Sequence, residues 1–128
     1  GSGNTGFWAD IFITAMGNIN IDVATAQELI VTKYARNSFL ATKVSFFNQI
    51  YELCQKAGID YEAVKQHTTA DERIGDSHTT ITEERGFGGH CFPKDTKAFL
   101  VSAKLNDTQL SILQEAVDYN NSIRKDQV

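Results

Sequence analysis

No glycine or proline occurs in this sequence from about Thr25 to Ala57. Because these two residues are the strongest helix breakers, the segment predicts one long α-helix, ended by Gly58 as its C-terminal cap. Such a helix would be about 50 Å long, which is more than a domain of this size needs for its own core. We therefore expect its apolar surface to face more than one neighbour.

Two apolar sides can be traced along this predicted helix. One consists of Phe39, Phe46, Ile50 and Leu53, and the other of Leu40, Val44, Phe47, Tyr51 and Cys54. Together they are wider than the stripe that a single packing partner covers. Either a second subunit packs on one side, which would give a homodimer through the long helix, or one large core surrounds the helix.

The rest of the sequence predicts a mostly α fold. Three shorter helices are expected: one capped by Asp60 and running to about His67, one opened by Phe92-Pro93-Lys94 and ending near Asn106, and one capped by Asp107 or Thr108. The polar, glycine-punctuated segment 68–90 predicts a loop.

The N-terminal residues have a different pattern. Gly1-Ser2-Gly3 is typical of an expression remnant and is set aside. A short helix over 7–16 and a strand over 19–23 then make half of an α/β repeat, which suggests a piece of a larger sheet. We therefore divide the chain into 1–3, an α/β remnant over 4–23, and a helical domain over 24–128.

Composition argues against several classes of function. The 128 residues carry 12 Lys and Arg against 16 Asp and Glu, a net charge of -4, and no basic cluster. This balance provides no electrostatic surface for nucleic acid. No apolar run reaches the ~20 residues of a membrane span and no signal peptide is evident, so we expect a cytoplasmic protein without a membrane partner.

The segment from Gly86 to Asp95, Gly-Phe-Gly-Gly-His-Cys-Phe-Pro-Lys-Asp, carries the densest chemical signal. It delivers Cys91 to a helix start, where free amides and Lys94 favour the nucleophilic thiolate. Asp95 lies one turn further on, where it can hold a water or accept a proton. The alternative is an inert buried cysteine with a solvated carboxylate beside it.

The glycine spacing and the cysteine spacing argue against a dinucleotide site, a zinc site and a redox pair. The glycines do not form a dinucleotide fingerprint, because Cys91 stands at the third glycine position and no strand precedes the loop. The two cysteines have no partner spacing for zinc or for a redox pair, and no metal site is predicted. Cys54 lies among apolar helix residues, so we interpret it as a core residue.

Three further polar residues each allow two interpretations. Lys33 and Asn37 lie four apart on the long helix, either polarising a carbonyl oxygen together or forming a solvated edge of the apolar stripe. Arg73 is either an anion clamp or a surface ion pair with Asp71. From spacing alone the solvated edge and the surface pair are favoured.

Residues 33–48 and 86–95 together resemble the central domain of the UDP-glucose/GDP-mannose dehydrogenase family, and the resemblance extends over about 24–124. Phe92-Pro93-Lys94 is nearer to the UDP-glucose branch. The resemblance implies a helical dimerisation domain between two Rossmann domains. It also implies oxidation of a UDP-sugar at C6 to a carboxylate with two NAD, here UDP-glucose to UDP-glucuronate.

The resemblance also implies roles for individual residues. Cys91 would capture the aldehyde as a thiohemiacetal that becomes a thioester, Lys33 and Asn37 would support the oxyanion, and Asp95 would place or activate water. Arg73 would reach a nucleotide sugar across the dimer, Phe87 and Gly88 would line the sugar pocket, and Lys94 would lie near the cofactor. His90 departs from the serine common before the nucleophile, which affects the expected shape of the pocket.

On this basis we expect a central-domain fragment that is inactive alone. NAD would be bound by a domain that this chain lacks, and residues 4–23 would be the remnant of that domain. Two alternatives stay open. One is a stand-alone helical dimerisation module without activity, and the other is a cysteine hydrolase that uses Cys91 with His67 or His78.

Overall fold

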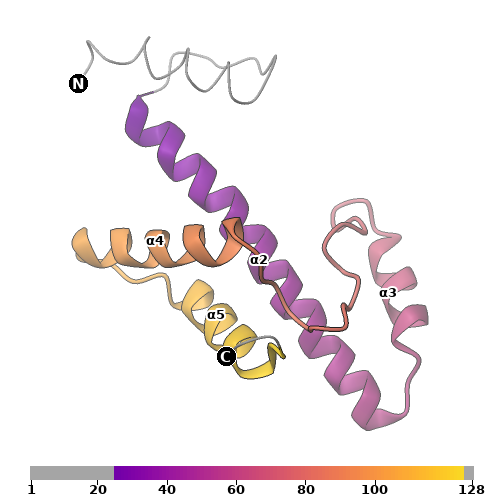
Figure 1. The fold of residues 1–128 in the computed structure, drawn as a ribbon. Helices are drawn as coiled ribbons and strands as arrows, with labels where there is room; N and C mark the ends of the chain where they lie inside the picture. Colours follow the sequence, from indigo (N-terminus) through magenta and orange to yellow (C-terminus); the bar gives the residue numbers. More distant parts are fainter. Residues whose placement is uncertain (1–24, 126–128) are drawn as a thin grey trace. The chain divides into compact units, whose positions relative to one another are not determined.

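A computed structural model describes residues 25–125, whose regular secondary structure consists of four α-helices (Figure 1). The helices are α2 (Ala26–Ala57), α3 (Tyr61–Thr69), α4 (Cys91–Leu105) and α5 (Ser111–Ile123). No strand occurs between residues 25 and 125, so the predicted mostly α fold is confirmed for this span. The helix predicted over 7–16 and the strand predicted over 19–23 lie outside the described residues. Among residues 25–125, no helix has the length and apolar character needed to cross a membrane.

The chain divides into two units, residues 1–36 and 37–128, and the boundary falls within α2. The packing described below belongs to the second unit. There, the first part of α4 is joined to α2 by a hydrogen bond from Asn37 to Asp95, and α5 is joined to α2 by one from Ser45 Oγ to Ala116 O, 2.9 Å. The helices α4 and α5 also pack against each other.

Both ends of α2 are set by local hydrogen bonds. At its start, Glu28 N donates to Thr25 Oγ1 at 3.1 Å and Thr25 N donates to Glu28 Oε2 at 3.4 Å, which is a reciprocal capping box. At its end, Gly58 has a φ of 71° and Ile59 N donates to Cys54 O at 2.9 Å. A left-handed glycine with this bond is the usual C-terminal cap. The predicted bounds of the long helix and its Gly58 cap are therefore confirmed.

The two predicted sides of α2 differ in exposure. On one side Phe47 and Cys54 are 4% and 3% exposed and form a core cluster with Tyr61, so the core assignment of Cys54 is confirmed. On the other side Phe39, Phe46 and Leu53 are 69%, 54% and 61% exposed. Ile50 was predicted on the same side as Phe39, Phe46 and Leu53, but it packs against the core cluster. A single core that surrounds the helix is therefore wrong for the described residues.

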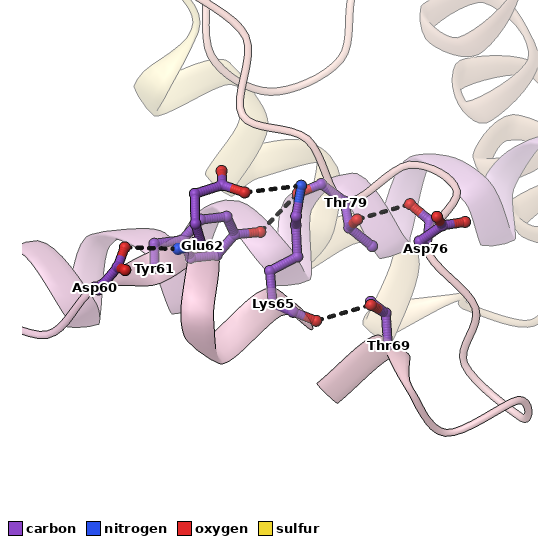
Figure 2. Close-up of polar contacts among 7 residues, drawn as sticks. All are labelled: Asp60, Tyr61, Glu62, Lys65, Thr69, Asp76 and Thr79. Atoms are coloured by element: carbon purple, nitrogen blue, oxygen red, sulfur yellow. Dashed lines mark hydrogen bonds and ion pairs between the residues drawn. The ribbon is translucent and has the colours of Figure 1, made fainter. Parts of the chain in front are cut away.

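The helix α3 anchors the loop that follows it (Figure 2). Asp60 caps the helix as predicted, because its Oδ1 accepts from Glu62 N at 3.1 Å, and the helix ends two residues after the predicted His67. The buried Tyr61 donates its hydroxyl to Thr79 O at 2.6 Å, and Thr79 Oγ1 donates to Asp76 O at 2.7 Å. The loop is thus fastened to α3 by a buried phenol.

This buried phenol predicts a loss of stability in alkaline solution. Burial first, and then the charge of Glu62, raise the pKa of Tyr61 from 10.0 to about 12. Since the folded pKa is the higher one, the neutral phenol stabilises the fold fully below pH 10, and this contribution is lost as the pH rises toward 12. The expected loss is about 2 kcal/mol, measured by urea unfolding between pH 8 and 12.

Two variants check the origin of that loss. Tyr61→Phe should be less stable than the wild type at pH 8 by about 1 kcal/mol, because Thr79 O loses its donor. It should also show a smaller decline between pH 10 and pH 12. The matched variant is Tyr119→Phe, since Tyr119 also has its pKa raised to about 12, by burial and by its bond to Glu52, but its hydroxyl donates to Glu52 and not to Thr79 O. An alkaline decline in Tyr61→Phe equal to that of the wild type would contradict the assignment.

The start of α4 differs slightly from the prediction. The helix begins at Cys91, one residue before Phe92, so Pro93 is its third residue and not its first. A proline is still tolerated there, because the amides of the first helical turn have no intrahelical acceptor. The cysteine itself therefore belongs to the helix.

The predicted cap of the last helix is wrong. Helix α5 begins at Ser111, and its cap residue Leu110 makes no side-chain capping bond. Asp107 and Thr108 instead complete the end of α4: Asp107 has a φ of 57° and donates to Lys104 O at 3.1 Å, and Thr108 N donates to Ala103 O at 3.0 Å. These two bonds form a Schellman motif, in which an aspartate takes the position that glycine usually holds.

Candidate active site

The site is built around Cys91, which is the first residue of α4 and is exposed. The loop before it turns at Gly86 and Gly89, which have φ values of 66° and 81°. His90 precedes the helix without a side-chain capping bond. The alternative expectation that Cys91 is buried is therefore wrong, while its reactivity stays a prediction.

A half-buried amide of α2 is paired with a buried carboxylate of α4. Asn37 of α2 donates from Nδ2 to Asp95 Oδ2 of α4 at 2.6 Å, across 58 residues of sequence. Asp95 is 1% exposed, and its other oxygen, Oδ1, is buried with no hydrogen-bond partner among the described residues. The interpretations of Asp95 as a solvated carboxylate and of Asn37 as a solvated helix edge are therefore wrong.

The unpartnered oxygen of Asp95 has a chemical consequence. A buried carboxylate oxygen without a donor is costly, so a site that retains one favours a water or a hydroxyl at that position. Asp95 is also four residues after Cys91 in the same helix, which places the two on one face. The arrangement can therefore hold a water close to a group attached to the cysteine.

The structure does not test the expected roles of the two lysines. Lys33 is exposed on α2, in the unit that comprises residues 1–36. Lys94 is exposed in the first turn of α4. Their roles, toward an oxyanion and near a cofactor, stay predictions from the resemblance.

Arg73 forms the surface ion pair that its spacing favours. Its Nη2 lies 2.6 Å from Asp71 Oδ2, and its side chain is 85% exposed. The hydrogen bonds from Arg73, first from its side chain and then from its backbone, hold the pKa of Asp71 below its ordinary value. Its predicted contact with a nucleotide sugar across a dimer is not tested by a single chain.

Phe87 and Gly88 lie on a groove of about 630 Å³ between α4 and α5. Phe87 is 5% exposed, and a side chain at position 88 would collide with the guanidinium of Arg124. Lys97 and Lys104 of α4 also line the groove. The two residues predicted for a sugar pocket therefore border a cavity with cationic groups.

Two asparagines that were not predicted from the sequence hold this loop. Asn48 of α2 and Asn120 of α5, both buried, hydrogen-bond to the segment 85–87. A signal existed for Asn48, since it is a polar residue directly after Phe47 on the apolar side of the long helix. The same reasoning had singled out Lys33 and Asn37.

For the alternative of a cysteine hydrolase, the structure gives no hydrogen bond between Cys91 and a histidine among the described residues. The ring of His78 lies 5.8 Å from that of Phe92, a packing contact. A cysteine nucleophile of the hydrolase type needs an imidazole hydrogen-bonded to the thiol. In residues 25–125, no group of three or more His, Cys, Asp or Glu side chains is arranged to hold a metal ion.

The four helices and the exposed cysteine at the start of α4 agree with a family profile that the sequence matches. Residues 27–122 match the profile of the "UDP-glucose/GDP-mannose dehydrogenase family, central domain", and the chain belongs to this family.

Named relatives and a solved structure agree with this assignment. The chain is 40% identical over 101 residues to UDP-glucose 6-dehydrogenase YwqF of Bacillus subtilis, covering 79% of this chain and 22% of the relative. It is 42% identical over 100 residues to UDP-glucose 6-dehydrogenase of Pseudomonas aeruginosa, covering 78% and 21%. The structure of a UDP-glucose dehydrogenase from Pyrobaculum islandicum matches with a TM-score of 0.74 and 31% identity, covering 89% of this chain and 26% of that one. The chain thus spans about a fifth of the length of these curated relatives, 22% and 21%.

The family is one of NAD-dependent dehydrogenases, but the described residues do not form an NAD site of the Rossmann type. A dinucleotide site of the Rossmann type needs a strand, a glycine-rich turn and a helix in succession. Residues 25–125 contain no strand, and the glycine loop leads from α3 into α4. NAD binding is therefore not assigned to this part of the chain.

Proposed function

We propose that this chain supplies the catalytic cysteine and part of the sugar pocket of an NAD-dependent UDP-glucose 6-dehydrogenase, which converts UDP-glucose to UDP-glucuronate. The observation that carries the proposal is the 2.6 Å hydrogen bond between Asn37 and Asp95. It joins two predicted site residues from helices far apart in the sequence, and one of them, Asp95, lies one turn after the exposed Cys91 in α4.

The chemistry assigned to these residues begins after the C6 alcohol has become an aldehyde. The Cys91 thiolate adds to the aldehyde carbon, and the carbonyl oxygen becomes the oxyanion of a thiohemiacetal. One N–H of the Asn37 amide is used by Asp95, which leaves the second to donate to this oxyanion. The family resemblance assigns the same role to the Lys33 ammonium.

A water must then release the product. After the second oxidation the sugar is a thioester of Cys91, and water attacks its carbonyl carbon, expelling the thiolate and leaving the carboxylate. Asp95 Oδ1, buried and unpartnered, is the group that accepts a hydrogen bond from this water and orients it. When bound, NAD would supply the hydride acceptor for both oxidations.

The groove between α4 and α5 supports the proposed substrate, and exposed side chains support the proposed homodimer. Phe87 and Gly88 border the cationic groove between α4 and α5, which suits a sugar attached to phosphates. Arg73 is exposed, as a residue that contributes to a neighbouring subunit's site must be. The exposed Phe39, Phe46 and Leu53 on α2 support a homodimer through this helix, since such apolar side chains are favourably buried at an interface.

A domain exchange tests the proposal. Residues 27–122 replace the corresponding segment of the Bacillus subtilis relative, and NADH formation from UDP-glucose is measured. We expect oxidation with two NADH formed per UDP-glucose consumed. The control is the Cys54→Ala chimera, which should stay active because Cys54 is a buried core residue. A folded, dimeric chimera without activity would favour the alternative of a dimerisation module.

A further inference from the structure

Two buried asparagines from different helices hold the segment that leads into α4. Asn48 of α2 is 1% exposed, and its Oδ1 accepts from Arg85 Nε at 2.7 Å and from Gly86 N at 3.2 Å. Asn120 of α5 is 2% exposed, and its Oδ1 accepts from Phe87 N at 2.6 Å while its Nδ2 donates to Phe87 O at 2.9 Å. Residues 85–87 are thus bound from two sides.

The bonds to Asn120 define the backbone more closely than a single contact does. One amide side chain satisfies both the N–H and the C=O of Phe87, as a neighbouring strand would. Gly86 has a φ of 66°, and a Cβ on it would collide with Asn120 Oδ1. The absence of a side chain at position 86 therefore allows Asn120 to approach.

The first turn of α4 is held to α2 through Asp95, but its first residue has no side-chain cap. His90 provides no side-chain capping bond. Cys91 follows Phe87 by four residues, so the direction in which the chain leaves Phe87 determines where the first turn of the helix begins. We propose that Asn48 and Asn120 are positioning residues for Cys91, acting through residues 85–87.

A positioning role and a purely structural role predict different behaviour. If the asparagines position the helix start, removing one should loosen residues 86–98 and leave α3 as stable as before. If they only add to global stability, every segment should open more often by the same factor. The reactivity of Cys91 is not needed to tell these apart, although the importance of its position rests on the proposed function.

Amide hydrogen exchange of the full chain makes this comparison in Asn48→Ala and Asn120→Ala. We expect exchange about tenfold faster over 86–98, including the amides of Asp95 and Thr96, which neither asparagine contacts. Exchange in α3 should stay within about twofold of the wild type. The matched control is Ser45→Ala, which removes a buried bond of 2.9 Å between α2 and α5 and should leave 86–98 unchanged.

The outcomes separate clearly. Equal acceleration in α3 and in 86–98, or acceleration that stops at Phe87 and spares Asp95 and Thr96, would overturn the proposal. If an alanine variant does not fold, Asn120→Asp gives the same test, because it keeps the acceptor for Phe87 N and sets an oxygen against Phe87 O. Exchange is measured without catalysis, so an inactive chimera would count against the proposed function and not against this one.

Discussion

The Cys91→Ala variant of the chimera should lose at least about a thousandfold in kcat for UDP-glucose oxidation. Cys91 is the exposed first residue of α4, and in the proposed reaction every product molecule passes through a bond to its sulfur. An alanine side chain cannot form the covalent intermediate in place of the Cys91 thiolate. The loss should therefore appear in kcat, with little change in KM. Steady-state NADH formation measures both constants.

Variants of the pair behind the cysteine should have smaller effects. Asn37→Ala removes one donor to the oxyanion and should cost about a hundredfold in kcat, a typical loss for one such donor. Asp95→Asn keeps the shape of the side chain and removes the carboxylate that orients water. Because that carboxylate serves the hydrolytic step, this variant should accumulate acyl-enzyme on Cys91, visible by mass spectrometry. A Cys91→Ala chimera that keeps a tenth of the activity would contradict the catalytic assignment.

Gly86→Ala should destabilise the chain by about 3 kcal/mol, the largest effect expected of a single methyl group here. Two costs add. A φ of 66° costs an L-residue about 1–2 kcal/mol, and the new Cβ would displace Asn120 from the two bonds that it makes to Phe87. Urea unfolding of the purified chain, followed by circular dichroism, gives the change in the free energy of unfolding.

Gly58→Ala is the matched control for this variant. Gly58 has a nearly identical φ of 71°, but a Cβ there would meet no atom within 4 Å. Only the backbone cost applies, so we expect a loss of about 1 kcal/mol. Equal losses for the two variants would show that Asn120 does not limit position 86.

The elements that could be predicted from sequence are those whose ends are determined locally. Gly58 and Asp60 satisfy helix termini within a few residues, so their roles follow from residue type alone. The start of α5 could not be found this way, because Asp107 suits a helix N-cap and also tolerates the left-handed conformation that ends α4. Only the hydrogen bonds of Asp107 and Thr108 distinguish the two uses.

The site was predictable to a different degree at each residue. The spacing of Cys91 and Asp95 indicates a shared helical face. For Asn37, spacing favours a solvated position, and only the resemblance predicts that it belongs to the same site as Cys91 and Asp95. Asn48 and Asn120 were missed, because a buried amide is recognisable only once the backbone that it satisfies is known. The roles of Lys33, Lys94 and Arg73 stay predictions.

The side-chain hydrogen bonds that hold residues 85–87 do not depend on groups that change protonation near neutral pH. The side-chain partners are amides and guanidinium groups: Asn48, Asn120 and Arg124, whose Nη1 donates to Arg85 O at 3.0 Å. Amides do not titrate, and guanidinium keeps its proton throughout the range in which enzymes are assayed. These three side chains therefore keep one protonation state in mildly acidic and mildly alkaline buffer. A bell-shaped rate profile for this site would then not report on the hydrogen bonds that they make to residues 85–87.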